Sequence, residues 1–126
     1  MTLTEIKNLT NSQLDCKVAE LNGWEKGPKK DIKIGLFGKI SPMICWHRKT
    51  EKDNWVDFPP YFTISLDEMH EVIKNMPKNR LHFYCDCLLE LAGTNHGGAF
   101  EATARQRAEA FVFAMEQKLS PKQKIH

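Results

Sequence analysis

Four residues that can bind metal ions lie in two closely spaced pairs. Cys45 and His47 form one pair, and Cys85 and Cys87 form the other. Residues two apart on a β-strand point to the same face, so each pair on a strand could present two zinc ligands together. Paired cysteines of zinc sites are usually separated by two or more residues, whereas a single residue separates Cys85 from Cys87. We therefore expect no metal site and no cofactor, with reduced cysteines acting as small apolar residues.

The same region contains the residue types of a nucleophilic active site. Cys45, His47 and Asp53 supply a thiol, an imidazole and a carboxylate, which catalysis would require in hydrogen-bonding contact. The chain has no nucleophile elbow, no Gly-rich phosphate loop, no metalloprotease helix motif and no kinase motif. The sequence therefore predicts a protein that is not an enzyme. A small hydrolase or metal-dependent enzyme is the last-ranked alternative.

Aromatic and basic residues are interleaved between positions 46 and 61. Such side chains can stack on a nucleobase and neutralise a phosphate. The candidate ligand- or partner-binding residues here are Trp46, His47, Arg48, Trp55 and Tyr61. The alternative, which we favour, is that the two tryptophans are core aromatics of a hairpin whose charged residues face water.

Two further groups could bind an anion. Arg105 and Arg107 lie on the first turn of an expected helix, where the helix dipole disfavours cations, so their presence favours a partner. The cluster Asn95-His96-Gly97-Gly98 could present backbone N–H groups to an anion. A hairpin turn explains this cluster as well and is the preferred interpretation.

Three helix starts share one capping pattern, in which Ser or Thr is followed three residues later by Gln or Glu. Each side chain of such a pair can accept a hydrogen bond from an otherwise unpaired backbone N–H. The pairs are Thr10 with Gln13, Ser65 with Glu68, and Thr103 with Gln106. They predict helices over residues 11–22, 66–75 and 104–118, the first ending at Gly23 and the second before Pro77.

Strands are expected between and after these helices. Glycines and prolines punctuate residues 24–60, and residues 43–49 are the best strand there. Residues 81–91 combine aromatic and aliphatic side chains without an evident helical stripe and predict a long strand, with residues 99–102 pairing back as a short one. Helices and strands together predict an α+β fold.

Length and composition predict one small domain. Hydrophobic residues make up 41% of the 126 residues, which suffices for a single core over residues 1–118, followed by a flexible polar tail over residues 119–126. The 18 basic and 16 acidic residues give a net charge of +2, which makes nucleic acid an unfavourable partner and offers no strong attraction to a membrane. No secretory signal or membrane-spanning run is evident, so a cytoplasmic location is expected.

Three segments resemble the small phage proteins grouped as the phage ABA sandwich domain. They are LDCKVAELNGWE (14–25), NWVDFPPYFTISLDEMHEVI (54–73) and EATARQRAEAFVFAME (101–116), in the family's order. The resemblance covers most of the chain, but not residues 26–39 or the tail. It implies an α-β-α sandwich, with helices on both faces of a small, mainly antiparallel sheet, and it implies no reaction. The residues that match recurrent family positions look like fold determinants: Trp24, Tyr61, Thr63, Ser65, Arg105, Glu109, Ala110 and Phe111.

These observations lead to a functional hypothesis. The chain resembles a phage or prophage accessory protein that acts in the bacterial host cell by binding a host protein or other macromolecule, for instance in counter-defence. The alternative is a sponge that sequesters a nucleotide immune signal with the aromatic and basic residues named above. A homo-oligomer is compatible with either function.

Overall fold

The structure of the protein is a computed structural model that describes residues 1–29, 33–34, 39–40, 43–50, 56–93 and 102–117. The described elements are α1 (Leu3–Lys7), α2 (Asn11–Leu21), β1 (Trp24–Lys29), β2 (Lys33–Ile34), β3 (Lys39–Ile40), β4 (Met43–Arg48), α3 (Leu66–Lys74), α4 (Lys78–Ala92) and α5 (Ala104–Glu116). Helices and antiparallel strands are both present, so the predicted α+β class is confirmed.

The three predicted helix starts are confirmed. At α2, the Thr10 hydroxyl accepts a hydrogen bond from the Gln13 backbone N–H at 3.1 Å, and the Gln13 side chain accepts one from the Thr10 N–H at 2.9 Å. Thr103 and Gln106 form the same reciprocal pair at α5, whereas at α3 the Ser65 hydroxyl accepts from the Glu68 N–H at 3.3 Å. After α2, Gly23 adopts a φ of +88°, as expected for the residue that ends the helix.

The prediction of a strand over residues 81–91 is wrong, because this segment belongs to helix α4. Tyr84, Cys87 and Leu88 are buried at the i, i+3, i+4 spacing of a helix face. The segment contains no β-branched residue, and β-branched residues are the ones that favour strands. Its start is Pro77, which forms no side-chain capping hydrogen bond, so the pattern that marks the other helices is absent. The short helix α1, which was not predicted, does carry that pattern in Thr2 and Glu5.

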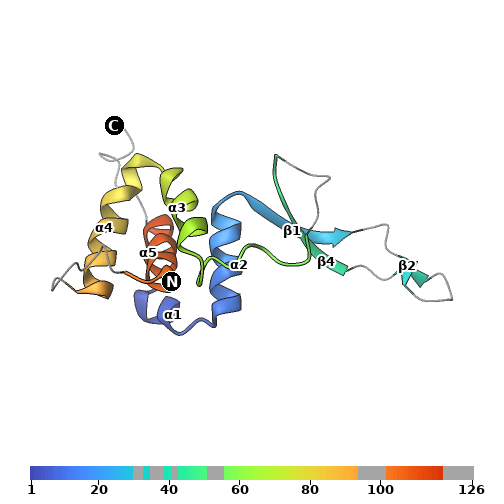
Figure 1. The fold of residues 1–126 in the computed structure, drawn as a ribbon, viewed down its shortest axis with the longest axis horizontal. Coiled ribbons are helices and arrows are strands. Elements are labelled where there is room, and N and C mark those ends of the chain that lie inside the picture. Colours follow the sequence, from blue (N-terminus) through green and yellow to red (C-terminus); the bar gives the residue numbers. More distant parts are fainter. Residues whose placement is uncertain (30–32, 35–38, 41–42, 51–55, 94–101, 118–126) are drawn as a thin grey trace.

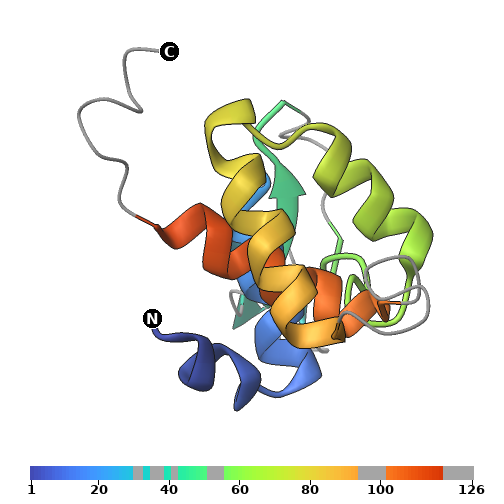
Figure 2. The same cartoon turned by 90° about the vertical axis from the view of Figure 1, so that its left-hand side faces the viewer.

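Helix α5 is the centre of the helical packing. It contacts α1, α2, α3 and α4, and Figure 2 shows it passing behind α4 with α1 and α3 on its two sides. Its buried face includes Phe111 and Val112, which join Leu14, Val18 and Met69 in a single core. Arg80 of α4 donates from Nη1 to the backbone carbonyls of Ala114, Met115 and Gln117 at 3.0, 2.8 and 2.7 Å, so it binds the carboxyl end of α5.

The strands form a hairpin beside the helical cluster. β1 pairs antiparallel with β4, from Trp24 opposite Arg48 to Lys29 opposite Met43, and the predicted strand over residues 43–49 is thereby confirmed as β4. Val56 bridges to the other edge of β4 through two backbone hydrogen bonds with Trp46, at 2.7 and 2.8 Å. A second small ladder joins β2 to β3 at the far end of the hairpin (Figure 1).

The described strands do not form the middle layer of an α-β-α sandwich, which the resemblance had implied. Helix α2 contacts β1, and the hairpin extends away from the helical cluster on the side of α2 (Figure 1). The described helices pack chiefly on α5 instead of covering two faces of a sheet.

Several predictions fall outside the described residues. They are the turn over residues 95–98, most of the short strand over residues 99–102, Asp53, Trp55 and the tail over residues 119–126. Among the helices that the structure does describe, none combines the length and apolar character that a membrane crossing requires.

Candidate binding site

The segment between β4 and α3 presents apolar side chains to solvent. Phe58, Tyr61 and Ile64 are 69%, 60% and 71% exposed, although the first two are aromatic. Single exposed apolar residues are common on protein surfaces, whereas several gathered around one depression indicate a binding surface. We call residues 56–65 the platform segment.

The platform segment borders a first depression, the apolar hollow, with a volume of about 270 Å³. Helix α2 contributes Asp15 and Cys16 to its wall, β4 contributes Trp46, and the platform segment contributes Phe58 and Ile64, among other residues. Burial raises the pKa of the Cys16 thiol, which disfavours the reactive thiolate form. The chemistry of this hollow is that of a contact surface for apolar groups.

A second depression, the acidic hollow, adjoins the same segment and has a volume of about 420 Å³. Trp24 from the start of β1 and Glu68 from the first turn of α3 line it together with Asp57. Phe58, Pro59 and Tyr61 line both hollows and thus form their shared wall.

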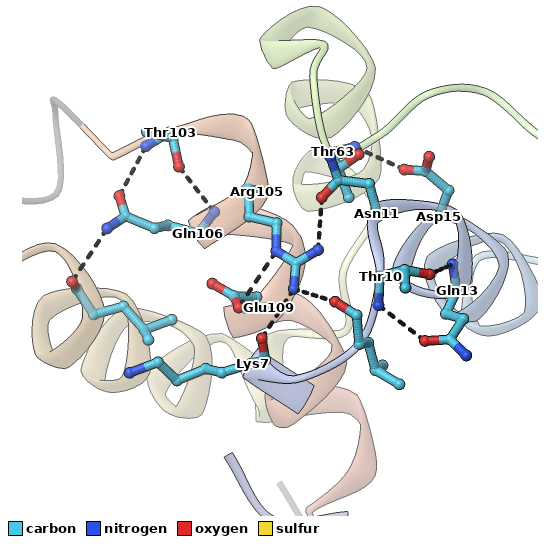
Figure 3. Close-up of polar contacts among 12 residues, drawn as sticks. Lys7, Thr10, Asn11, Gln13, Asp15, Thr63, Thr103, Arg105, Gln106 and Glu109 are labelled. Atoms are coloured by element: carbon cyan, nitrogen blue, oxygen red, sulfur yellow. Dashed lines mark hydrogen bonds and ion pairs between the residues drawn. The ribbon is translucent and has the colours of Figure 1, made fainter. Parts of the chain in front are cut away.

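The platform segment is anchored at both ends. Val56 is held by its backbone pairing with Trp46. At the other end, Oδ1 of the buried Asp15 accepts a hydrogen bond from the Thr63 backbone N–H at 2.8 Å, and the neighbouring Phe62 is buried in the core (Figure 3). Burial raises the pKa of the Asp15 carboxyl, and its hydrogen bonds with Thr63 offset part of that rise. The exposed side chains therefore project from a connection whose backbone is fixed.

Two of the residues predicted for binding, Trp46 and Arg48, lie on one face of the hairpin together with Trp24 and Lys26 of β1. The Arg48 guanidinium lies 5.3 Å from the centroid of the Trp24 ring, and the Lys26 ammonium lies 5.8 Å from that of Trp46. Trp46 is 5% exposed, so it is a core aromatic that reaches the wall of the apolar hollow and cannot stack freely on a base. Of the predicted set, Trp46 and Tyr61 meet at this hollow, and Trp55 lies outside the described residues.

Cys45 and His47 point away from that face and are engaged with separate partners. The imidazole of His47 is buried, with Nδ1 2.8 Å from the Arg48 carbonyl oxygen and Nε2 3.7 Å from the Glu25 carboxylate. The Cys45 thiol donates to Asp57 Oδ1 across 4.0 Å. The third member of the expected catalytic set, Asp53, is not among the described residues. A thiol paired directly with a carboxylate, rather than with an imidazole, lacks the activating base of a cysteine nucleophile.

The second cysteine pair does not present two ligands on one face, because it lies on a helix. Cys85 is exposed, whereas Cys87 is buried, and burial raises the pKa of its thiol to about 11. The four cysteines are free thiols, and no group of three or more His, Cys, Asp or Glu side chains that could hold a metal ion occurs in the described part of the chain.

Arg105 is occupied by contacts within the protein. Its guanidinium donates to Asn11 Oδ1 at 2.6 Å and to the carbonyl oxygens of Leu9 and Lys7 at 2.6 and 3.1 Å, and Nε lies 3.5 Å from the buried Glu109 carboxylate (Figure 3). Burial raises the pKa of Glu109, and the charge of Arg105 offsets part of that rise. The prediction of an exposed anion-binding residue therefore does not fit Arg105, which fastens α5 to the connection between α1 and α2.

Arg107 is likewise turned toward the protein. Its Nε donates to the Ala102 carbonyl at 3.2 Å, and its side chain interacts with the phenol of the buried Tyr84. Neither arginine lines the two hollows.

Most of the hollows' wall was not predicted from the sequence. Asp15 sits on the predicted helix 11–22 but reaches the site only because the platform segment returns to that helix. Phe58 could have been identified from the sequence. The two prolines of Phe58-Pro59-Pro60-Tyr61 exclude a helix or a central strand there, and the two aromatic residues beside them are therefore expected in a loop. Comparison of the chain with models of protein families, with curated protein sequences and with solved structures finds no match.

Proposed function

We propose that the protein is a binding protein that holds an apolar segment of a partner protein against the platform segment. The observation that carries this proposal is the exposure of Phe58, Tyr61 and Ile64 around the apolar hollow. Aromatic side chains that can enter or flank a hollow are the residues that most often dominate binding energy at protein interfaces.

The anchoring of the platform segment supports the proposal. Its backbone is held to β4 at Val56 and to α2 at Thr63, so a partner does not have to order this segment when it binds. Preorganisation of this kind reduces the entropic cost of association.

The charges at the site favour a protein partner over a nucleotide. The walls of the two hollows include Asp15, Asp57 and Glu68, and no lysine or arginine belongs to them in the described part of the chain. A nucleotide phosphate would meet carboxylates here, so the nucleotide sponge becomes the alternative that the experiment below must exclude.

The resemblance to the phage ABA sandwich domain supports a biological setting. One of the three segments that carry the resemblance, residues 54–73, contains the whole platform segment. We therefore propose a phage or prophage accessory protein that acts without catalysis in the bacterial cytoplasm, with a host protein as its partner.

The experiment is a selection from a surface-displayed library of random peptides against the immobilised protein. Binding of the enriched peptides is then measured by calorimetry with three proteins: the wild type, Phe58→Ser/Tyr61→Ser and Leu81→Ser/Leu89→Ser. The control double variant removes apolar side chains that are also exposed, but on α4 and away from the hollows. We expect the platform variant to weaken binding at least about tenfold and the control to remain within about twofold of wild type.

Equal binding by the platform variant would overturn the proposal, and so would a failure to enrich any peptide. A nucleotide mixture offered to the same three proteins tests the alternative. Nucleotide binding that the platform variant loses and the control keeps would favour the sponge.

A further inference from the structure

The acidic hollow combines two features that attract cations. Trp24, Phe58 and Tyr61 bring aromatic rings to its wall, and Asp57 and Glu68 bring carboxylates. The face of an aromatic ring carries partial negative charge, so rings and carboxylates around one hollow both favour a positively charged occupant.

The two carboxylates are available to such an occupant. Asp57 is exposed, and its one described side-chain partner is the weakly donating Cys45 thiol. Glu68 lies on the first turn of α3, where its backbone N–H is bound by Ser65, and its carboxylate forms no hydrogen bond or ion pair with the described residues. Ion pairs form elsewhere on the protein, for example between Lys17 and Glu116 at 3.2 Å.

The protein itself shows that Trp24 accepts a cation. The Arg48 guanidinium lies 5.3 Å from the centroid of the Trp24 ring, yet Arg48 does not line the acidic hollow. Its positive charge opposes the entry of a second cation, whereas the two carboxylates of the hollow favour it.

We propose that the acidic hollow is the subsite for a lysine or arginine side chain of the partner protein. This inference rests on the proposed function. The apolar and acidic hollows share the wall of Phe58, Pro59 and Tyr61, so one short segment can place an apolar side chain in the first and a basic side chain in the second. The occupant is a polypeptide, because the acidic hollow, which favours a basic side chain, directly adjoins the apolar hollow.

The experiment compares two probes of nearly equal shape, capped lysine and capped norleucine, by NMR titration of the Trp24 indole N–H. We expect lysine to bind about fivefold more tightly than norleucine, a difference that should decrease with added salt. In Asp57→Asn/Glu68→Gln the lysine advantage should vanish. The matched control, Asp67→Asn, removes a carboxylate from the same turn of α3 that does not line the hollow, and it should retain the advantage.

Arg48→Gln provides a test in the opposite direction. Removal of the competing guanidinium should strengthen lysine binding about twofold or more, whereas a hollow that binds anions would be weakened by the same change. Equal binding of lysine and norleucine, or weaker lysine binding by Arg48→Gln, would overturn the subsite. Tighter binding of choline than of capped lysine would also overturn it, in favour of a small organic cation.

The two proposals fail in different ways. If selected peptides depend on Phe58 and Tyr61 but carry no basic residue, the proposed function stands, and the assignment of the acidic hollow to a lysine or arginine side chain is wrong. If no peptide depends on the platform segment, the proposed function is wrong whatever the lysine titration gives.

Discussion

Arg105 connects parts of the chain that are far apart in sequence. Its partners Lys7, Leu9 and Asn11 are the last residue of α1, a residue of the connection and the first residue of α2, and Glu109 lies one turn further along α5. Glu109 is only 6% exposed, so it depends on this cation for compensation of a buried negative charge.

We expect Arg105→Ala to lower the free energy of unfolding by about 2–3 kcal/mol, because it removes several charge-assisted hydrogen bonds and leaves Glu109 unpaired. Arg105→Met/Glu109→Leu should recover much of this loss, since it removes both charges. Urea unfolding measures both effects, with the exposed Lys74→Ala as the control. A midpoint for Arg105→Ala equal to that of wild type would mean that these contacts do not stabilise the fold.

Asp15 gives the fold a pH dependence of unusual sign. Its pKa in the folded protein is raised by burial above the ordinary value of 3.8, so the folded state binds this proton more tightly than the unfolded state does. The stability that Asp15 contributes through this proton is fully present below pH 3.8 and is lost as the pH rises through the folded pKa.

Asp15→Asn tests this dependence, because an amide oxygen can still accept the hydrogen bond from Thr63. Relative to wild type, the variant should gain stability as the pH rises from about 4 to neutrality. The measurement is the urea midpoint of both proteins across this range, with the exposed Asp67→Asn as a control. A difference that stays constant with pH would show that Asp15 titrates alike in the folded and unfolded states.

At the scale of single elements, α4 is the part that departs most from expectation. A strand would place Cys85 and Cys87 on one face, whereas the helix exposes Cys85 and buries Cys87. The two geometries predict different thiol chemistry.

We expect Cys85 to react rapidly with a thiol reagent in the native protein and Cys87 to react far more slowly, because Cys87 is buried and its pKa is raised to about 11. Mass spectrometry of peptides after timed labelling separates the two sites. Denaturant should make both reactive, which is the control for accessibility. Similar native rates at the two cysteines would contradict the helix.

The contrast between α4 and the other long helices shows what the sequence could predict at this scale. The starts of α2, α3 and α5 depend on residues three apart, so a local pattern suffices. Helix α4 has no such cap, and its buried stripe of Tyr84, Cys87 and Leu88 is recognisable only once it packs on α5. The lack of β-branched residues in this segment was the remaining indication of a helix.

At the scale of the whole molecule, the hairpin has a base that belongs to the core and an outer end that extends away from the helices (Figure 1). Trp46 at the base is in the core, while β2 and β3 pair with each other at the far end (Figure 1). Lys29 and Met43 lie opposite each other, so a two-residue turn can join them.

Replacement of residues 30–42 by Asn-Gly should therefore change the free energy of unfolding by no more than about 0.5 kcal/mol. Trp46→Ala, which alters the base, should cost about 3 kcal/mol or more, because it opens a cavity in the core. Thermal and urea unfolding of both variants provide the comparison. If the shortened protein lost as much stability as Trp46→Ala, the outer hairpin would have to be part of the core.

Only single residues of the candidate site could be predicted from the sequence, because its walls come from elements that lie apart in the chain. Tyr61 and Trp46 were identified from their residue types, but the hollows form only when α2, β4 and the platform segment come together. Asp15 and Thr63 lie far apart in the chain, and nothing local indicates their hydrogen bond. The α+β class could be predicted because it requires only the kinds of elements, whereas the site requires their contacts.

The central position of α5 has a consequence for how the protein is made. Four helices precede α5 in the chain, and each of them packs against it. During synthesis these helices emerge from the ribosome before the surface that will bury their apolar faces exists. Their contacts with α5 join residues distant in sequence, which slows folding and prolongs that exposed state. We infer that the nascent chain stays open to chaperones and proteases until α5 has emerged, and that the domain then folds in a single late step.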